Sequence, residues 1–296
     1  MEDLISIGDL SSAEIDEIFR LASELKKEPL GGDLRGKTVA MIFEKPSTRT
    51  RVSFEAGVYQ MGGHAVLLSD ATVQLGKRET IADVGRTLSR YVNGIVIRTF
   101  EHEKVLELAK YSSVPVINAL SDYSHPCQAL ADVFTIMEKY VGIGRDRHLP
   151  DGLKLVFMGD GNNVARSLNA LCKMTGINFV LCCPKGYEME DCEISHDPAQ
   201  AVKDADVIYT DVWTSMGQEK ETKKRLKDFA GFQVNGKLIN KVEVGRDRPL
   251  LIMHCLPAHR GEEITDDVID GPNSIVFDQA ENRLHVQKAV MTMLMG

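Results

Sequence analysis

The chain has 296 residues, of which 43% are hydrophobic and 26% are charged, so it is long enough for about two domains with separate cores. The net charge of −8 argues against a surface that binds nucleic acid or anionic membranes. There is no apolar run long enough to span a membrane, and the polar, acidic start of the chain is unlike a signal peptide. Six cysteines are too few for a disulfide scaffold and fit a reducing cytoplasm.

The first half of the chain alternates between helical and strand-like segments. The segments with helical spacing of apolar residues are 7–27, 51–61, 80–91 and 101–111. The short, β-branched apolar runs are 37–43, 64–68, 94–98 and 114–118. Residues 69–79 are polar and predict a loop. This alternation predicts a mostly parallel sheet with helices on both faces.

The stretch Phe43–Glu55 joins the first predicted strand to a helix and is rich in hydroxyl and guanidinium groups. Ser47 and Thr48 suit the start of a helix, so Ser47–Thr50 would lie at a helix N-terminus. Free backbone N–H groups and the helix dipole favour an anion there, and Arg49 adds donors that match a phosphate. The stretch therefore predicts either a phosphate site or an ordinary capped helix with a solvated arginine.

Two further groups in this half stand where ligands bind. Arg98 ends a predicted strand, and ligands of open α/β sheets bind at the carboxyl ends of strands. His125 and Gln128 precede and begin a helix that runs to about Tyr140, with Pro126 in its first turn. Their spacing of three residues puts the two side chains on one face. A simple cap or surface histidine is the alternative for His125.

Residues 141–152 are rich in glycine, proline and charge, which predicts a domain boundary. The alternation then restarts. Strands are predicted at 153–158, 178–183, 206–210, 250–253 and 274–277. Helices are predicted at 164–175, 198–203, 262–269 and 279–295. The fold class is therefore α/β, with two doubly wound domains, each with a central, mostly parallel sheet flanked by helices.

The turn after the strand at 153–158 reads Gly-Asp-Gly-Asn-Asn, which resembles part of a dinucleotide-binding fingerprint. The third glycine of that fingerprint is replaced by Val164, and the acidic residue expected about 20 residues later is missing. We therefore interpret the segment as a tight turn that presents Asn163 to a ligand.

Two polar segments follow strands in the second half. Asp211–Glu219 contains the only tryptophan and a Ser-Met-Gly sequence, and a surface loop is the alternative interpretation. His254-Cys255-Leu256-Pro257 follows the strand at 250–253. Metal ligation by His254, Cys255 and His259 is disfavoured, because no second ligand pair with zinc spacing exists. A buried structural cysteine is the common alternative for Cys255.

Together these motifs resemble those of the aspartate/ornithine carbamoyltransferase family. The shared features are Pro-Ser-Thr-Arg-Thr-Arg, His-Pro-x-Gln, Asp-x-x-x-Ser-Met-Gly, His-Cys-Leu-Pro and Glu-Asn-Arg, in that order over nearly the whole chain. The third and fourth are of the ornithine type. The resemblance implies transfer of a carbamoyl group from carbamoyl phosphate to the δ-amine of L-ornithine, giving citrulline. It leaves open whether the reaction serves arginine synthesis or breakdown.

The resemblance also implies a site in the cleft between the domains. Residues 1–141 would bind carbamoyl phosphate, with the helix at 280–296 packing back on them, and residues 152–279 would bind ornithine. The carbamoyl phosphate residues would be Ser47, Thr48, Arg49, Thr50, Gln74 from a neighbouring subunit, Arg98, His125, Gln128, Cys255, Leu256 and Arg283. The catalytic members would be Arg98, His125 and Cys255. Ornithine would contact Asn163, Asp211, Ser215 and Met216, with Cys255 and Leu256 at its reacting end. A homotrimer or a multiple of one is implied, with no metal or organic cofactor, no nucleic acid and no membrane partner.

Three alternatives stay open at this stage. The acceptor could be another amine, such as putrescine or N-acetylornithine, although Ser215-Met216-Gly217 favours free ornithine. The chain could be a non-catalytic binding or regulatory module on the same fold. A dinucleotide-dependent oxidoreductase is disfavoured by the broken glycine pattern.

Overall fold

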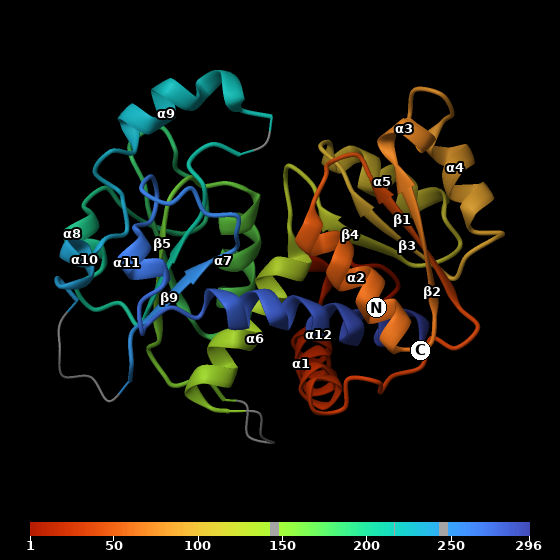
Figure 1. Ribbon diagram of the computed structural model, residues 1–296, viewed down its shortest axis with the longest axis horizontal. Coiled ribbons are helices and arrows are strands. Elements are labelled where there is room, and N and C mark those ends of the chain that lie inside the picture. The colour runs from red at the N-terminus through yellow and green to blue at the C-terminus, as the bar shows by residue number, and fades with distance from the viewer. Residues whose placement is uncertain (143–147, 216, 243–247) are drawn as a thin grey trace. The chain divides into compact units, whose positions relative to one another are not determined.

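The computed structural model describes residues 1–142, 148–215, 217–242 and 248–296 (Figure 1). Its internal contacts group the chain into two compact units. Unit 1 holds Met1–Phe134 and the C-terminal segment Glu281–Gly296, and unit 2 holds Thr135–Gly142 and most of the chain up to Ala280. Among the described residues, no helix is both long and apolar enough to cross a bilayer.

Unit 1 is built on a four-stranded sheet in which every neighbouring pair is parallel. Its strands are β1 (Thr38–Phe43), β2 (His64–Ser69), β3 (Gly94–Arg98) and β4 (Val116–Leu120). The spatial order is β2-β1-β3-β4, so the direction of strand succession reverses between β1 and β3. In open α/β sheets such a reversal opens a crevice at the carboxyl ends of the two strands.

Helices cover both faces of this sheet (Figure 1). They are η1 (Ile7–Asp9), α1 (Ser12–Lys27), α2 (Thr48–Gln60), α3 (Asp70–Val73), α4 (Ile81–Leu88) and α5 (His102–Tyr111). Ala40 and Ile42 of β1 pack into one core with residues of α4 and α5. Alternate residues of a strand point to opposite faces, and Val39 and Met41 are equally buried. The near-continuous apolar strands therefore result from burial on both sides.

Unit 2 repeats this plan with a five-stranded parallel sheet. Its strands are β5 (Lys154–Met158), β6 (Asn178–Cys182), β7 (Glu193–Ser195), β8 (Val207–Thr210) and β9 (Leu251–His254). The order is β7-β6-β5-β8-β9, with the reversal between β5 and β8. The helices here are α7 (Asn163–Thr175), α8 (Pro198–Ala201), η2 (Glu219–Glu221), α9 (Thr222–Asp228), α10 (Gly236–Ile239) and α11 (Asp266–Ile269).

Two helices belong to both units. Helix α6 (Pro126–Tyr140) begins in unit 1 and ends in unit 2, whereas α12 (Val276–Met295) begins in unit 2 and ends in unit 1. The final turns of α12 are tied down inside unit 1 by Lys288, a fully buried lysine that donates to the carbonyl of Pro29 and to Gln60 Oε1.

The predicted fold class, two parallel-sheet domains flanked by helices, is confirmed. The expected strand at 274–277 is wrong, because Ser274 forms only an isolated bridge to Ile252 and α12 already begins at Val276. The predicted helix at 262–269 shrinks to α11, and the predicted loop at 69–79 begins with the short helix α3. The strand β7 and the helices α9 and α10 were not predicted. Part of the expected boundary at 141–152 lies outside the described residues.

Candidate functional site

The helix terminus predicted from the sequence is present in unit 1. Helix α2 begins directly after β1, and Ser47 is its N-cap residue, whose hydroxyl accepts a hydrogen bond from the Thr50 N–H at 3.3 Å. The remaining N–H groups of the first turn have no partner within the helix, so they are available to an acceptor. With the helix dipole they make this end of α2 a site for an anion.

The hydroxyl of Thr50 lies between two arginines. Arg98, the last residue of β3, and Arg283 of α12 each place a guanidinium nitrogen 3.5 Å from Thr50 Oγ1. Both arginines and Thr50 are at least nine-tenths buried. Two buried positive charges beside a helix N-terminus create a strongly positive local potential, which suits a multiply charged anion such as a phosphate group.

His125 and Gln128 are buried in the same region, at the start of α6. The pKa of His125 is held well below its usual value, first by burial and then by the charges of Arg283 and Arg98. The imidazole is therefore neutral at physiological pH. The side-chain oxygen of Gln128 accepts a hydrogen bond from Arg283 Nη1. The structure thus brings Thr50, Arg98, His125, Gln128 and Arg283 together.

The other predicted residues of unit 1 differ in their exposure. Thr48 is exposed and Arg49 is partly exposed at the start of α2. Gln74 is exposed just after α3, with a left-handed backbone (φ 46°), and its carbonyl accepts from two N–H groups of its own loop. Its predicted role, in the site of a neighbouring subunit, is not one that a single chain can display.

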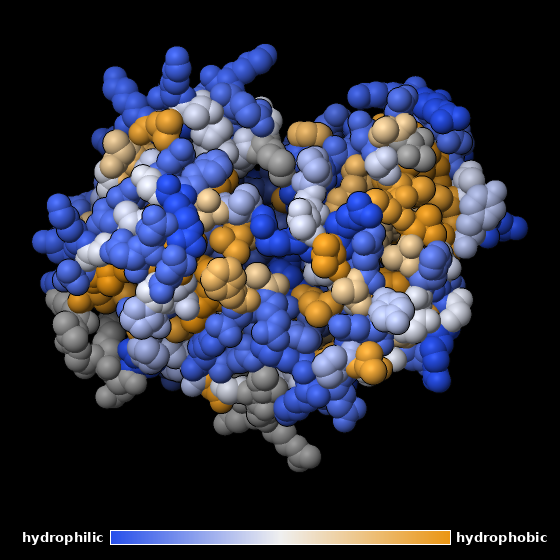
Figure 2. Space-filling view, in the orientation of Figure 1, coloured by the Kyte–Doolittle hydropathy of each residue, from blue (hydrophilic) through white to orange (hydrophobic). Residues whose placement is uncertain are grey.

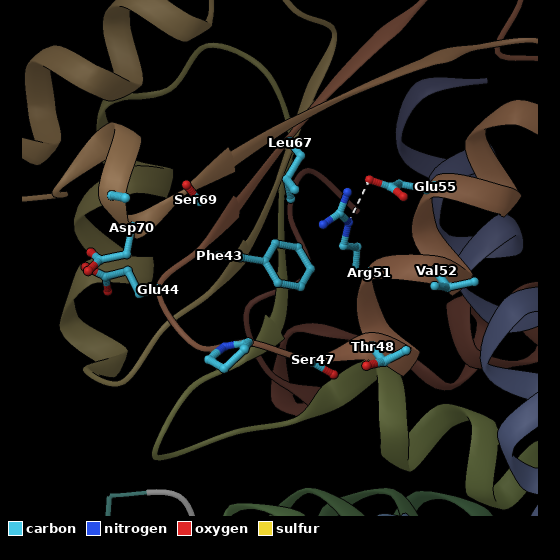
Figure 3. A pocket seen from close by; sticks show the side chains of 12 residues that line it. Phe43, Glu44, Ser47, Thr48, Arg51, Val52, Glu55, Leu67, Ser69 and Asp70 are labelled. Carbon is cyan, nitrogen blue, oxygen red and sulfur yellow. Dashed lines mark hydrogen bonds and ion pairs between the residues drawn. The ribbon is translucent and has the colours of Figure 1, made fainter.

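A surface hollow lies beside the same helix α2. Figure 3 shows Phe43 in its middle, with Leu67 of β2 above it and Ser47 and Thr48 at its lower end. Arg51 and Glu55 of α2 form an ion pair across one wall at 3.1 Å. The hollow therefore combines an apolar floor with a charged rim.

The polar group at the strand reversal of unit 2 is Asp211, which directly follows β8 and is 7% exposed. Its Oδ1 accepts from the Val212 N–H at 2.8 Å, and its Oδ2 accepts from Asn162 Nδ2 at 2.9 Å. Asn162 is in turn the N-cap of α7, where its Oδ1 accepts from two backbone N–H groups. The orientation of the Asp211 carboxylate is therefore fixed by a residue that is itself held in place.

Cys255 follows β9, and its thiol contacts Asp211 Oδ1 at 3.0 Å. The turn behind it is held by a buried pair. His254 Nδ1 accepts from the Leu256 N–H at 2.8 Å, and its Nε2 lies 2.9 Å from Glu263 Oε1, with both side chains fully buried. Since Nδ1 accepts, Nε2 must carry the proton that is donated to Glu263. Leu256 has a left-handed backbone (φ 56°) and is followed by a cis peptide bond to Pro257.

The loop after Asp211 is anchored by a buried arginine. Arg225 of α9 donates to Asp160 Oδ2 at 2.6 Å and to the carbonyl of Trp213 at 3.0 Å. Burial raises the pKa of Asp160, and the adjacent Arg225 opposes that rise. Ser215 is partly buried, and its N–H donates to Gln218 Oε1 at 3.1 Å. Met216 lies outside the described residues.

Asp211, His254 and Cys255 bring one ligand atom each within 4.8 Å of one another. Both ring nitrogens of His254 are already used, one by a backbone N–H and one by Glu263. A cation could bind the imidazole only by displacing one of these contacts. The geometry therefore fits an acceptor for N–H groups better than it fits a metal centre.

Comparison with known families separates the same two halves of the chain. Residues 2–138 match the profile described as "Aspartate/ornithine carbamoyltransferase, carbamoyl-P binding domain", and residues 151–294 match "Aspartate/ornithine carbamoyltransferase, Asp/Orn binding domain". The chain belongs to the aspartate/ornithine carbamoyltransferase family. The resemblance inferred from the motifs is therefore confirmed.

Individual members of the family agree over the full length. The ornithine carbamoyltransferase of Thermococcus kodakarensis is 53% identical, over 99% of this chain and 96% of that protein. The solved ornithine carbamoyltransferase of Pyrococcus furiosus is 50% identical, with a TM-score of 0.91 over 100% of this chain and 97% of its own. A solved N-acetyl-L-ornithine transcarbamylase is also similar, at 32% identity and a TM-score of 0.86, over 99% of this chain and 100% of its own.

Sequence reasoning missed several residues that hold the site. Asn162 contacts Asp211, whereas Asn163, which was predicted to face the ligand, is partly exposed at the first position of α7. Glu263 and Arg225 also escaped notice. Each is a buried charged residue on a segment without a motif, and its neighbours along the chain are mostly charged or polar, so no local signal marks it as buried.

Proposed function

We propose that this protein is an enzyme that transfers the carbamoyl group of carbamoyl phosphate to the δ-amine of L-ornithine, giving L-citrulline and phosphate. The observation that carries this proposal is the cluster at the N-terminus of α2, where Arg98 and Arg283 meet at Thr50. Relatives named ornithine carbamoyltransferase at about half identity support the choice of acceptor.

On the carbamoyl phosphate side, the phosphate group would accept from the N–H groups and hydroxyls of Ser47–Thr50 and from Arg49 and Arg98. The carbamoyl oxygen would accept from Thr50, Arg98 and His125. Because His125 is neutral, it can donate one N–H without adding a third charge. Donors that are already in place where negative charge grows in the transition state lower its energy without rearrangement.

On the ornithine side, Asp211 would balance the positive charge of the amino acid. Asn163, Ser215 and Met216 would hold the rest of ornithine, and Cys255 and Leu256 would lie at the reacting amine and the carbamoyl group. An amine with a pKa near 10 is mostly protonated at pH 7, so the site must favour its neutral form. The Cys255–Asp211 pair, 3.0 Å apart, offers acceptors for the departing proton.

The reaction then needs one bond to form and one to break. The lone pair of the neutral δ-nitrogen attacks the carbamoyl carbon, and the bond from that carbon to the bridging oxygen breaks. Phosphate leaves with the electron pair and takes up the proton lost by the amine. The sequence of steps calls for no metal or organic cofactor. It does require the two units to bring both substrates together and exclude water, which would otherwise hydrolyse the acyl phosphate.

A steady-state assay of the purified protein tests the proposal directly. Citrulline formation is measured with carbamoyl phosphate and ornithine, and parallel reactions replace ornithine by putrescine, N-acetylornithine or aspartate. We expect ornithine to give the highest kcat/KM. A higher value with another amine would reassign the acceptor, and no turnover with any of them would favour a non-catalytic binding module.

The same proposal assigns residues 1–141, with the helix at 280–296, to carbamoyl phosphate and residues 152–279 to ornithine. Family profiles for the two binding domains match similar ranges. We also propose a cytoplasmic location. No disulfide joins any of the six cysteines, all of which lie in the described part of the chain, and this fits a reducing compartment.

We further propose a homotrimer, or a multiple of one, in which Gln74 enters the site of a neighbouring subunit. Hydrophobic residues gather over β1 and β2 in unit 1 (Figure 2), and the inner residues of the edge strand β2, Ala65–Leu68, are only partly buried. An exposed apolar edge of this kind is normally covered. Sedimentation of the wild type and of Leu67→Asp tests the assembly. We expect trimers for the wild type and smaller species for the variant, and a monomeric wild type would overturn the proposal.

A further inference from the structure

The amide of Gln128 is held on both sides by buried groups of opposite hydrogen-bonding character. Its Nε2 donates to Asp132 Oδ1 at 2.8 Å, one turn further along α6. Its Oε1 accepts from Arg283 Nη1. Gln128 is 2% exposed and Asp132 is fully buried, so water does not compete for these bonds.

Arg283 is held in a similar way by a second glutamine. Gln287, one turn later on α12 and fully buried, accepts from Arg283 Nε at 3.1 Å and Nη2 at 2.9 Å when its oxygen faces the arginine. In that orientation its amide nitrogen donates to Ser53 Oγ at 2.6 Å. The Ser53 hydroxyl then donates to the carbonyl of Thr50 at 3.2 Å.

These bonds have only one consistent direction. A guanidinium donates and never accepts, whereas a carboxylate accepts and does not donate. If the amide of Gln128 were turned over, its NH2 would face Arg283 and its oxygen would face Asp132. Both contacts would then be repulsive between buried groups, where unsatisfied polar atoms are most costly. The network therefore allows Gln128 only one orientation.

We propose that Asp132 and Gln287 are positioning residues that keep the Gln128 oxygen facing the acyl group, so that the enzyme selects an acyl phosphate carrying an N–H donor. This inference rests on the proposed function and deepens it. An amide oxygen has two lone pairs, and Arg283 uses one of them. The other is left for the NH2 of carbamoyl phosphate, which acetyl phosphate replaces by a methyl group that cannot donate.

The test compares the wild type with Asp132→Asn in three measurements. These are kcat/KM for carbamoyl phosphate and the inhibition constants of acetyl phosphate and inorganic phosphate, each as a competitor of carbamoyl phosphate. The asparagine side chain offers a donor as well as an acceptor, so the Gln128 amide is no longer restricted to one orientation. We expect kcat/KM to fall about tenfold or more, the worth of one good hydrogen bond. Both inhibition constants should stay within about twofold, since neither competitor uses the Gln128 oxygen.

Gln287→Met provides a second variant that keeps a similar volume but releases Arg283. Like Asp132→Asn, it should weaken the use of carbamoyl phosphate more than the binding of acetyl phosphate. Asp206→Asn is the matched control, because Asp206 is a 2%-exposed aspartate of unit 2 that accepts from the Lys154 N–H. It should lower the melting temperature without changing the preference for carbamoyl over acetyl phosphate.

Two results would overturn the inference while leaving the proposed function intact. In the first, the wild type makes citrulline and the Asp132→Asn enzyme keeps the wild-type preference for carbamoyl phosphate over acetyl phosphate. The other is an equal loss for all three phosphate compounds in both variants, which would assign Asp132 and Gln287 a purely structural role. Absence of citrulline formation by the wild type would instead reject the proposed function itself.

Discussion

Each unit carries a polar cluster at the strand reversal of its sheet, and these two clusters, called half-sites below, have opposite chemistry. In unit 1, the reversal between β1 and β3 gathers two buried arginines, a neutral histidine and a helix N-terminus. In unit 2, the reversal between β5 and β8 presents the carboxylate of Asp211 beside the thiol of Cys255. The fold supplies only the position, and the side chains decide which substrate binds.

The difference also concerns how each half-site is assembled. The donors of unit 1 come from β3, α2, α6 and α12, which are distant along the chain. Asp211 is instead held by nearby backbone and by the turns after β5 and β9. A phosphate that must be bound and then released as a leaving group needs many fixed donors. An amine that must lose a proton needs an acceptor for that proton.

The largest expected effect comes from removing a charge in unit 1. Arg98→Ala should lower kcat/KM for carbamoyl phosphate roughly 100- to 1,000-fold, the range found when one preorganised transition-state donor is lost. The KM for ornithine should change little. Arg86→Ala is the control, because Arg86 is an exposed arginine of α4 that pairs with Asp83 and lies over the ring of Tyr111. Initial rates over a grid of both substrates give these constants, and an Arg98→Ala enzyme with normal kcat/KM would refute the assignment.

A smaller effect is expected in the half-site of unit 2. Cys255→Ala should reduce kcat or raise the KM for ornithine by about 10- to 100-fold, because the thiol lies beside the carboxylate that would receive the reacting amine. Binding of carbamoyl phosphate, followed by calorimetry, should be unaffected. Cys192→Ala, a partly buried cysteine of the same unit, should behave as the wild type. Equal losses for both substrates would contradict this division of labour.

The next prediction concerns the loop that follows Asp211. Arg225→Met breaks a buried ion pair with Asp160 and releases the Trp213 carbonyl. It should raise the KM for ornithine about tenfold and lower the free energy of unfolding by about 3 kcal/mol. Lys224→Met, in which an exposed pair with Asp228 is lost, should lower the free energy of unfolding much less. Denaturant titration and substrate kinetics measure both, and similar losses in the two variants would argue against an anchoring role.

The smallest expected effect is a pH dependence of stability. The pKa of His125 is lowered in the folded protein, so below about pH 6.5 the unfolded chain binds a proton that the folded chain does not. The contribution of the neutral His125 to the free energy of unfolding is fully present above that pH. Below it, this contribution falls by up to about 1.4 kcal/mol per pH unit. His125→Asn should therefore lower the free energy of unfolding less at pH 5.5 than at pH 7.5, as measured by denaturant titration. A cost that is equal at both pH values would mean that His125 titrates normally.

The sequence predicted several strand ends and the N-cap of α2 because local rules govern them, whereas most of the proposed site residues came from the family motifs. Ser47 has to cap α2, and Arg98 has to end β3, whatever the rest of the molecule does. The choice between Asn162 and Asn163 was different. Both stand in one tight turn, and a shift of a single residue decides which becomes the N-cap and reaches Asp211. Only the finished geometry distinguishes them.

The errors and omissions have equally physical causes. The segment Ser274–Phe277 is short, apolar and β-branched. Periodicity alone does not tell whether such a short run forms a strand or part of a helix. Asp132, Gln287 and Glu263 had no signature, because a buried polar residue is recognised by its partner. Asp132 and Gln287 each lie one helical turn from their partner, but the contact that gives those partners their role, between Gln128 and Arg283, joins residues 155 positions apart. Patterns within a window of one or two helical turns do not reveal that contact.

The last helix of the chain, α12, carries Arg283, a member of the cluster around the N-terminus of α2. During synthesis, the polypeptide thus completes the other donors of unit 1 long before its last guanidinium emerges from the ribosome. A partly synthesised chain that stops before α12 therefore lacks one of the two buried charges, and it cannot close the Asp132–Gln128–Arg283–Gln287 network.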